Sequence, residues 1–200
     1  EGYQFLPEEE LLQNPNKQYL GDPFYTSLKY QFRYRDKIQF GLTAEKDAGE
    51  QFWGDKNKGY DFYSGYLQLN DFGRFKTIVV GDYRANFGQG LVMRNEYSFG
   101  KSSLVLNVTP RNSGLKKSSS TDEYNFLRGA GTTVSLGKFD ITAFYSYRKL
   151  DADTAEGQFT SIKKDGLHRT ESDLYKKQNV TQQVVGGNIT FSHANFKVGV

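Results

Sequence analysis

Hydrophobic and polar side chains alternate without interruption from residue 28 to residue 35. One set of positions carries Leu28, Tyr30, Phe32 and Tyr34, and the other carries Lys29, Gln31, Arg33 and Arg35. Successive side chains of a β-strand point to opposite faces, so the pattern predicts a strand with one apolar and one polar face. The alternation resumes after Asp36-Lys37 and continues to residue 45, which predicts a hairpin with a tight turn.

The same arrangement of strand, turn and strand recurs three more times along the chain. The predicted hairpins span residues 63–83, 130–147 and 185–200, with turns at 70–73, 137–138 and 192–195. Sequence identity between the copies is slight, and only the two-residue period and the turn residues repeat. We therefore expect one antiparallel meander of successive hairpins.

Long polar connections separate the hairpins, at 46–60, 84–124 and 149–178, and the middle one has room for a further strand around 104–108. Short turns that alternate with long loops are typical of outer-membrane barrels, and strands of about 9–11 residues suit a tilted crossing of the hydrocarbon layer. The prediction is an all-β, antiparallel up-and-down meander of about eight strands that forms part of a transmembrane outer-membrane β-barrel. Residues 24–200 make up the partial barrel. Residues 1–23 form a segment before it, with at most one short helix over 6–13.

The alternation assigns the side chains to two surfaces. The residues predicted to face the lumen are polar: Lys29, Gln31, Arg33, Arg35, Glu45, Lys76, Asp82, Asp140 and Arg148. The residues predicted to face lipid are apolar or aromatic: Leu28, Tyr30, Phe32, Tyr34, Phe40, Leu67, Leu69, Ile141, Tyr145 and Ile189. Mixed charge along a wet interior is typical of a channel or a plugged lumen, although such ions can also serve only to neutralise one another.

A soluble antiparallel β-sandwich that binds glycans is the alternative, because a sheet with one solvated face alternates in the same way. Three features favour the membrane. Short and long connections alternate regularly, lysine and arginine occupy the middle of strands, and tyrosines such as Tyr25, Tyr34 and Tyr147 lie near strand ends, as in an interfacial girdle.

Composition removes several other classes of protein. No apolar run approaches the roughly 18 residues of a membrane helix, and the mean hydropathy of −0.69 does not exclude a barrel, since only alternate residues of a barrel strand meet lipid. Aromatic residues make up 16% of the chain, which argues against disorder. The net charge of +3 is too small for a nucleic-acid footprint over the whole surface. Cysteine is absent, and the chain opens without a signal-peptide pattern, so any secretory signal has been removed or lies upstream.

Several strings resemble a Bacteroidetes-type family of outer-membrane barrels. They are the segments 41–50 (GLTAEKDAGE), 81–91 (GDYRANFGQGL), 125–130 (NFLRGA) and 166–170 (GLHRT), and the likeness extends over residues 30–187. Members often carry helix-hairpin-helix repeats before the barrel, a module that grips DNA backbone in other proteins. The resemblance implies more strands than this chain holds, so we expect a fragment, and contact with nucleic acid is expected only through a module outside this chain.

No catalytic, metal or cofactor site is predicted. His168 and His193 have neither cysteine nor paired histidine spacing nearby, and both are expected at the surface. A hydrolase at the barrel rim, built from His168 with Ser161 or Ser172, is conceivable but has no G-x-S-x-G motif to support it.

The expected function follows from the predicted fold. We expect a non-enzymatic channel, docking scaffold or translocation component in the outer membrane of a Gram-negative bacterium. Its partners would be outer-membrane lipid, lipopolysaccharide and other envelope proteins.

Overall fold

A computed structural model describes residues 17–54, 57–87, 93–94, 114–155, 158–194 and 196–200, together with Glu10 and Asn14. The helix predicted over 6–13 and the further strand around 104–108 lie outside the described residues. Among the described residues, no helix is long and apolar enough to cross a bilayer.

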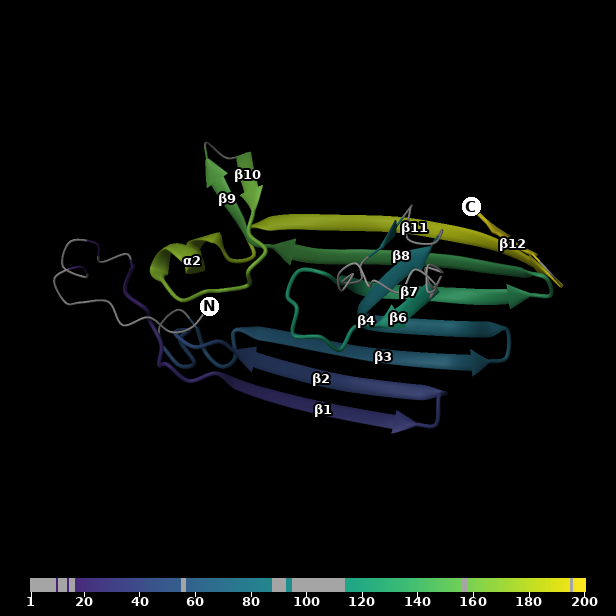
Figure 1. Cartoon of the computed structure of the whole chain (residues 1–200), viewed down its shortest axis with the longest axis horizontal. Coiled ribbons are helices and arrows are strands. Elements are labelled where there is room, and N and C mark those ends of the chain that lie inside the picture. The colour runs from purple at the N-terminus through teal and green to yellow at the C-terminus, as the bar shows by residue number, and fades with distance from the viewer. Residues whose placement is uncertain are drawn as a thin grey trace, which may run out of the picture.

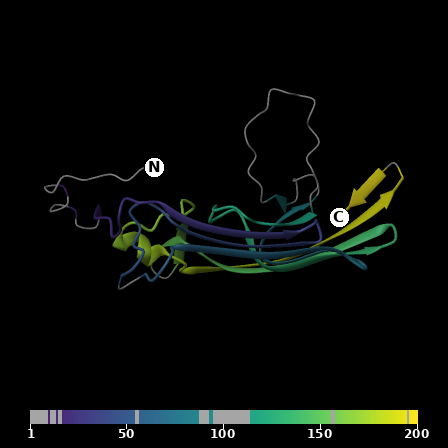
Figure 2. The same ribbon diagram turned by 90° about the horizontal axis from the view of Figure 1, so that it is seen from below.

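Eight strands follow one another in a single antiparallel sheet, and each pairs with the next in this order. They are β1 (Thr26–Tyr34), β2 (Ile38–Lys46), β3 (Phe62–Phe72), β4 (Phe75–Phe87), β7 (Leu127–Leu136), β8 (Phe139–Leu150), β11 (Val180–His193) and β12 (Phe196–Gly199). The prediction of an all-β antiparallel meander is confirmed. Figures 1 and 2 show one elongated, curved sheet.

The tight turns lie at one end of the sheet, and the β2–β3 and β8–β11 connections lie at the other (Figure 1). At this second end lie a separate two-stranded sheet, β9 (Ala152–Ala155) with β10 (Gln158–Ile162), and the short helix α2 (Glu171–Lys176). Thr170 and Asp173 form a capping box that satisfies the first backbone donors of α2. These elements were not predicted, because each is only four to six residues long.

The strand register places the predicted apolar and polar positions on two separate faces. Phe40 pairs with Leu67, and Ile141 pairs with Val134 and Ile189, while Thr142 pairs with Thr133 and Asn188. Paired residues of an antiparallel sheet point to the same side. Each face is therefore continuous across the strands, and we name them the apolar face and the polar face.

Large aromatic rings on the polar face lie over glycines of the neighbouring strand. A Cβ atom added to Gly41 would be 2.6 Å from the Tyr66 ring, and one added to Gly186 would be 2.4 Å from the Phe144 ring. Both positions therefore require the absence of a side chain.

The end of β4 and a short strand fold back over the polar face. β6 (Gly114–Lys117) pairs with Tyr83–Asn86 of β4, and β5 (Met93–Arg94) pairs with Asn86 and Phe87. We call 84–87 and 114–119 the in-folded segment. The periodicity predicts a loop at 84–87, and this prediction is wrong. A short local pattern could not reveal the strand, because the residues that pair with it lie about 30 positions further along the chain.

A small hydrophobic core joins the in-folded segment to the sheet. Its members come from β4, β6, β7 and β8: Val79, Tyr83, Ala85, Phe87, Leu115, Leu127 and Phe144. Phe87 stacks on Phe144 with ring centroids 5.9 Å apart. The burial of these side chains provides the energy that fixes the in-folded segment on an otherwise polar surface.

Two long strand edges are unpaired among the described residues. β1 pairs only with β2, and the half of β11 that precedes Asn188 pairs only with β8. The described strands therefore form an open sheet.

Candidate functional site

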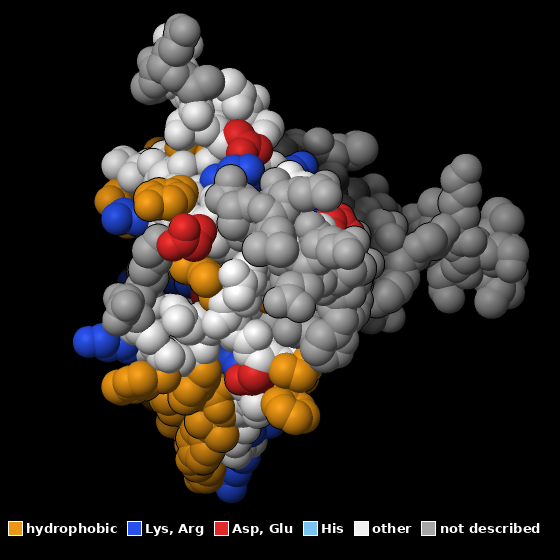
Figure 3. Space-filling view, turned by 90° about the vertical axis from the view of Figure 1, so that its left-hand side faces the viewer, with side chains coloured by type: hydrophobic (Ala, Val, Ile, Leu, Met, Phe, Trp, Pro, Cys, Tyr) orange, Lys and Arg blue, Asp and Glu red, His pale blue; other side chains and the backbone are white. Residues whose placement is uncertain are grey.

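The exposure of the two faces is the reverse of that in a soluble sheet. On the apolar face the side chains are exposed, 62% for Leu28 and 53% for Ile189. Other exposed members are Tyr30, Phe32, Tyr34, Leu42, Tyr63, Leu67, Val80, Ile141, Tyr145, Tyr147 and Val185. Phe40 and Leu69, also predicted on this face, are half-buried. Figure 3, viewed from the end where α2 lies, shows hydrophobic side chains gathered at the lower edge, on the β1 side of the sheet.

The polar face, in contrast, holds most of the buried polar side chains of the sheet. Its buried members include Thr43, Glu45, Ser64, Gln68, Thr133, Thr142, Ser146, Arg148 and Thr190. They are covered because the sheet curves and because the in-folded segment packs on this side. Lys117 donates its backbone N–H to Gln68 Oε1 (2.8 Å) and its Nζ to Tyr66 Oη (2.9 Å).

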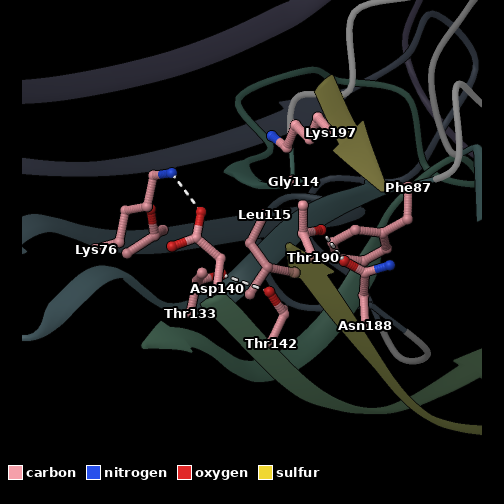
Figure 4. Close-up of a pocket in the computed structure, with 11 residues that line it drawn as sticks. Lys76, Phe87, Gly114, Leu115, Thr133, Asp140, Thr142, Asn188, Thr190 and Lys197 are labelled. Carbon is pink, nitrogen blue, oxygen red and sulfur yellow. Dashed lines mark hydrogen bonds and ion pairs between the residues drawn. The ribbon is translucent and has the colours of Figure 1, made fainter. Parts of the chain in front are cut away.

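A polar cavity of about 150 Å³ lies between the in-folded segment and the sheet (Figure 4). Lys76 Nζ contacts Asp140 Oδ2 at 2.7 Å, and the hydroxyls of Thr133 and Thr142 are 2.9 Å apart. Phe87 and Leu115 close the side formed by the in-folded segment, and Lys197 provides a second cation. The cavity is lined by hydroxyl groups, one ion pair and the amine of Lys197, and such groups can hydrogen-bond water and small ions. Its volume is large enough for several water molecules.

The residues predicted to face the lumen from β1 and β2 have separate local partners. Lys29 Nζ donates to Ser119 O of the in-folded segment (2.7 Å), and Gln31 Nε2 to Tyr66 Oη (3.4 Å). Arg33 pairs with Asp36 at the hairpin turn. Arg35 lies in the turn with a φ of 50°, outside both strands. Glu45 is buried and accepts a hydrogen bond from Tyr25 Oη (2.7 Å).

The remaining residues of this predicted set come from β4 and β8. Lys76 and Asp140 form the ion pair of the cavity. Asp82 is buried and accepts two hydrogen bonds from Arg128, at 2.6 and 2.8 Å. Arg148 is also buried and donates to Phe126 O (2.6 Å). The structure thus joins Lys76 to Asp140 in an ion pair, and the other members of the set form no ion pair with one another.

The sequence analysis missed a cluster of charged residues at the end of the sheet where α2 lies. We call it the charge cluster, and its members are Glu50, Asp61, Glu123, Asp151, His168 and Lys177. His168 was expected at the surface, but it is only 2% exposed, so that prediction is wrong. Its Nδ1 lies 2.5 Å from Asp61 Oδ2, and its Nε2 lies 3.1 Å from Asp151 Oδ2. Lys177 Nζ contacts Asp61 Oδ1 at 2.7 Å. His193, also expected at the surface, is exposed.

The charge cluster connects three loops and the segment before β1. Glu50 Oε1 accepts the backbone N–H of His168 (2.7 Å), and Leu20 donates its N–H to Arg169 O (2.9 Å). The prediction that His168 lies at the surface was wrong because the residues that bury it are up to 118 positions away in the sequence. The only local signal was the pair of aspartates that immediately flank β3 and β8.

Electrostatics keep the imidazole charged. Burial alone would lower the pKa of His168, but its hydrogen bonds to Asp151 and Asp61 outweigh burial and raise the pKa to about 9. Burial raises the pKa of Asp61, but its hydrogen bonds to His168 and Lys177 leave that pKa below the usual value. Burial, reinforced by the charges of Asp61 and Glu50, raises the pKa of Glu123 to about 9.

The charge cluster contains two groups of residues with the composition of a metal site: Glu50, Asp61 and His168, and Glu123, Asp151 and His168. In the structure, however, both ring nitrogens of His168 already contact carboxylates, and Lys177 provides a further positive charge. The rim hydrolase receives no support from this geometry, because Ser161 Oγ donates to Asp153 (2.9 Å) instead of contacting His168. We interpret the charge cluster as a structural element that holds the loops together.

Comparison with known proteins gave no match: no family model, no curated protein and no solved structure is detectably similar to this chain.

Proposed function

We propose that this sheet forms part of a transmembrane outer-membrane β-barrel, with its apolar face against lipid and its polar face around a water-filled interior. The exposure of the two faces is the observation that carries the proposal. In water, a sheet with one solvated face buries its apolar side and exposes its polar side. Here Thr142 is 5% exposed, whereas its neighbour Ile141 is 40% exposed.

The energetic argument depends on the size of the exposed apolar surface. Burial of one Leu, Ile, Phe or Val side chain contributes about 1.5–3 kcal/mol, and the apolar face leaves more than ten large side chains exposed on β1, β2, β3, β4, β8 and β11. Apolar patches of this extent on a protein usually mark an interface with a membrane or a partner. Lipid provides that burial for a barrel.

Strand length supports the same proposal. β1 and β2 have 9 residues each, β7 has 10, β3 has 11 and β8 has 12. A tilted strand needs about 9–11 residues to cross the hydrocarbon core. The short turns at one end, with the β2–β3 and β8–β11 connections at the other, also agree with such a barrel.

We propose further that the interior serves for passage of ions or small polar solutes and is narrowed by the in-folded segment. Docking or translocation of envelope proteins and contact with lipopolysaccharide remain predictions, as does the Bacteroidetes-type family. Lys29, Lys117 and Lys197 lie on the polar face or on the in-folded segment and form no ion pair among the described residues, so they would give the interior a preference for anions.

Two single-cysteine variants test the orientation of the faces, because the wild-type chain has no cysteine. Leu28→Cys and Lys29→Cys lie next to each other on opposite faces, and both side chains are exposed. With a fluorescent maleimide on each, we expect spin-labelled lipid to quench the label at position 28 and aqueous iodide to quench the label at position 29. Equal quenching by iodide at both positions, in protein that stays monomeric without detergent, would instead identify a soluble sandwich.

Conductance across a planar bilayer tests the passage of ions. We expect the reconstituted wild-type protein to conduct with a preference for anions, and Lys29→Glu with Arg33→Glu to shift the preference toward cations. Leu28→Gln is the matched control, since its side chain lies on the other face and should leave the selectivity unchanged. A folded protein that never conducts would eliminate the channel while leaving the barrel intact.

A further inference from the structure

Arg148 is a buried cation that forms no ion pair among the described residues. Its side chain is 5% exposed, and its Nη1 donates to a neutral acceptor, the carbonyl oxygen of Phe126. Its Nε atom has no hydrogen-bond partner. A buried charge is costly unless an opposite charge or a full set of hydrogen bonds compensates it.

The nearby carboxylates are committed to other donors. Asp82 receives both of its hydrogen bonds from Arg128. Asp122 accepts the backbone N–H groups of Tyr124 and Asn125 and the side-chain amide of Asn125, all within 3.0 Å. Arg128 therefore has a bidentate counter-ion and Arg148 has none, although both guanidinium groups lie over the same Phe126 ring, at 5.1 and 4.6 Å.

A cavity of about 190 Å³ lies beside Arg148. Its wall includes Arg148 and Gln182, which pair across β8 and β11, and the rings of Tyr124 and Phe126. A second cation is close, because Lys164 Nζ lies 5.0 Å from the centre of the Tyr124 ring. The cavity thus combines a guanidinium group that has no direct ion pair, an amide and two aromatic rings.

We propose that this cavity binds a small organic carboxylate, with Arg148 as its counter-ion. A carboxylate presents two oxygens in one plane, which matches the donor geometry of a guanidinium group. The aromatic walls favour an acid with a short carbon skeleton over a fully hydrated inorganic ion. The amide of Gln182 provides a polar group for the second oxygen.

The test measures the thermal stability of the folded chain with sodium acetate, against sodium chloride of equal ionic strength. A ligand that binds only the folded state raises the melting temperature in a saturable way. We expect a rise of about 5 °C for the wild-type protein at saturation, and none for Arg148→Met. This variant should still fold, because it replaces an unpaired buried charge by an apolar side chain of similar length. Arg148→Lys should keep part of the rise, since it retains the charge but loses the paired donors.

Lys149→Met is the matched control, because Lys149 is the next residue of β8 and is exposed. It should respond to acetate as the wild-type protein does. An equal rise in the wild-type protein and Arg148→Met, or no saturable rise in the wild-type protein, would overturn the proposal. Saturation by phosphate but not by acetate would also overturn it. The measurement applies equally to protein in detergent or in buffer, so its failure is distinct from failure of the proposed membrane function.

Discussion

Replacing Val185 with arginine is expected to lower the free energy of unfolding from a lipid bilayer by about 2–4 kcal/mol, the cost of a cation on the lipid face at the bilayer midplane. Val185 is exposed and pairs with Tyr145, which lies in the middle of β8. In a soluble protein the same exposed position would accept arginine at a cost within about 0.5 kcal/mol. Denaturant unfolding of the protein from phospholipid vesicles measures the difference.

Thr181→Arg is the depth control for this experiment. Thr181 lies on the same strand and the same face as Val185, but near the end of the sheet that carries α2, and it pairs with Lys149. A cation near the membrane interface should cost only about 0–1 kcal/mol. Equal effects of the two variants, or no effect of Val185→Arg, would contradict the orientation of the sheet.

Replacing His168 with glutamine should cost about 3–5 kcal/mol of folding free energy, because removal of one partner from a buried ion pair leaves the other charge uncompensated. Asp61 and Asp151 would both lose the imidazolium. Unfolding is to be measured near pH 6, where the wild-type imidazole is charged. His193→Gln is the control, since His193 is exposed and forms no ion pair among the described residues, and it should change stability by less than about 0.5 kcal/mol.

The pH dependence of the free energy of unfolding of the wild-type protein tests the charge cluster independently. The pKa of His168 is raised to about 9 in the folded state, so its contribution is fully present below its unfolded pKa of about 6.5 and is lost as the pH rises through about 9. The pKa of Glu123 is also raised to about 9, above its usual value of about 4.5, so the stability that its protonated form contributes is lost progressively from about pH 4.5 to about pH 9. Stability should therefore fall between about pH 6.5 and 9, and His168→Gln should show a shallower decline. A stability that rises with pH in this range would contradict the charge cluster.

The strands and hairpin turns could be predicted from the sequence because their signals are local. The alternation at 28–35 and 38–45 shows which side chains of β1 and β2 share a face. The two residues between these runs leave room only for a turn. Charged positions such as Lys76 and Asp140 were assigned to one surface for the same reason, and the structure brings these two together.

The in-folded segment and the charge cluster could not be predicted in this way. β6 binds β4 across about 30 intervening residues, and Leu115 carries no alternation that distinguishes it from a loop residue. The partners of His168 are Glu50 and Asp61 from the β2–β3 connection and Asp151, 17 residues before it, so no local pattern surrounds it. Contacts of this kind join residues that are far apart in the sequence, and periodicity does not describe them.

The two unpaired strand edges determine how this sheet can exist in hydrocarbon. Along β1, the backbone N–H and C=O groups that point away from β2 have no water to bind inside a bilayer, and each such group would cost several kcal/mol. The same holds for the first half of β11. Backbone pairing along both edges is therefore a condition for stable insertion, and without it the sheets are expected to add to one another edge to edge.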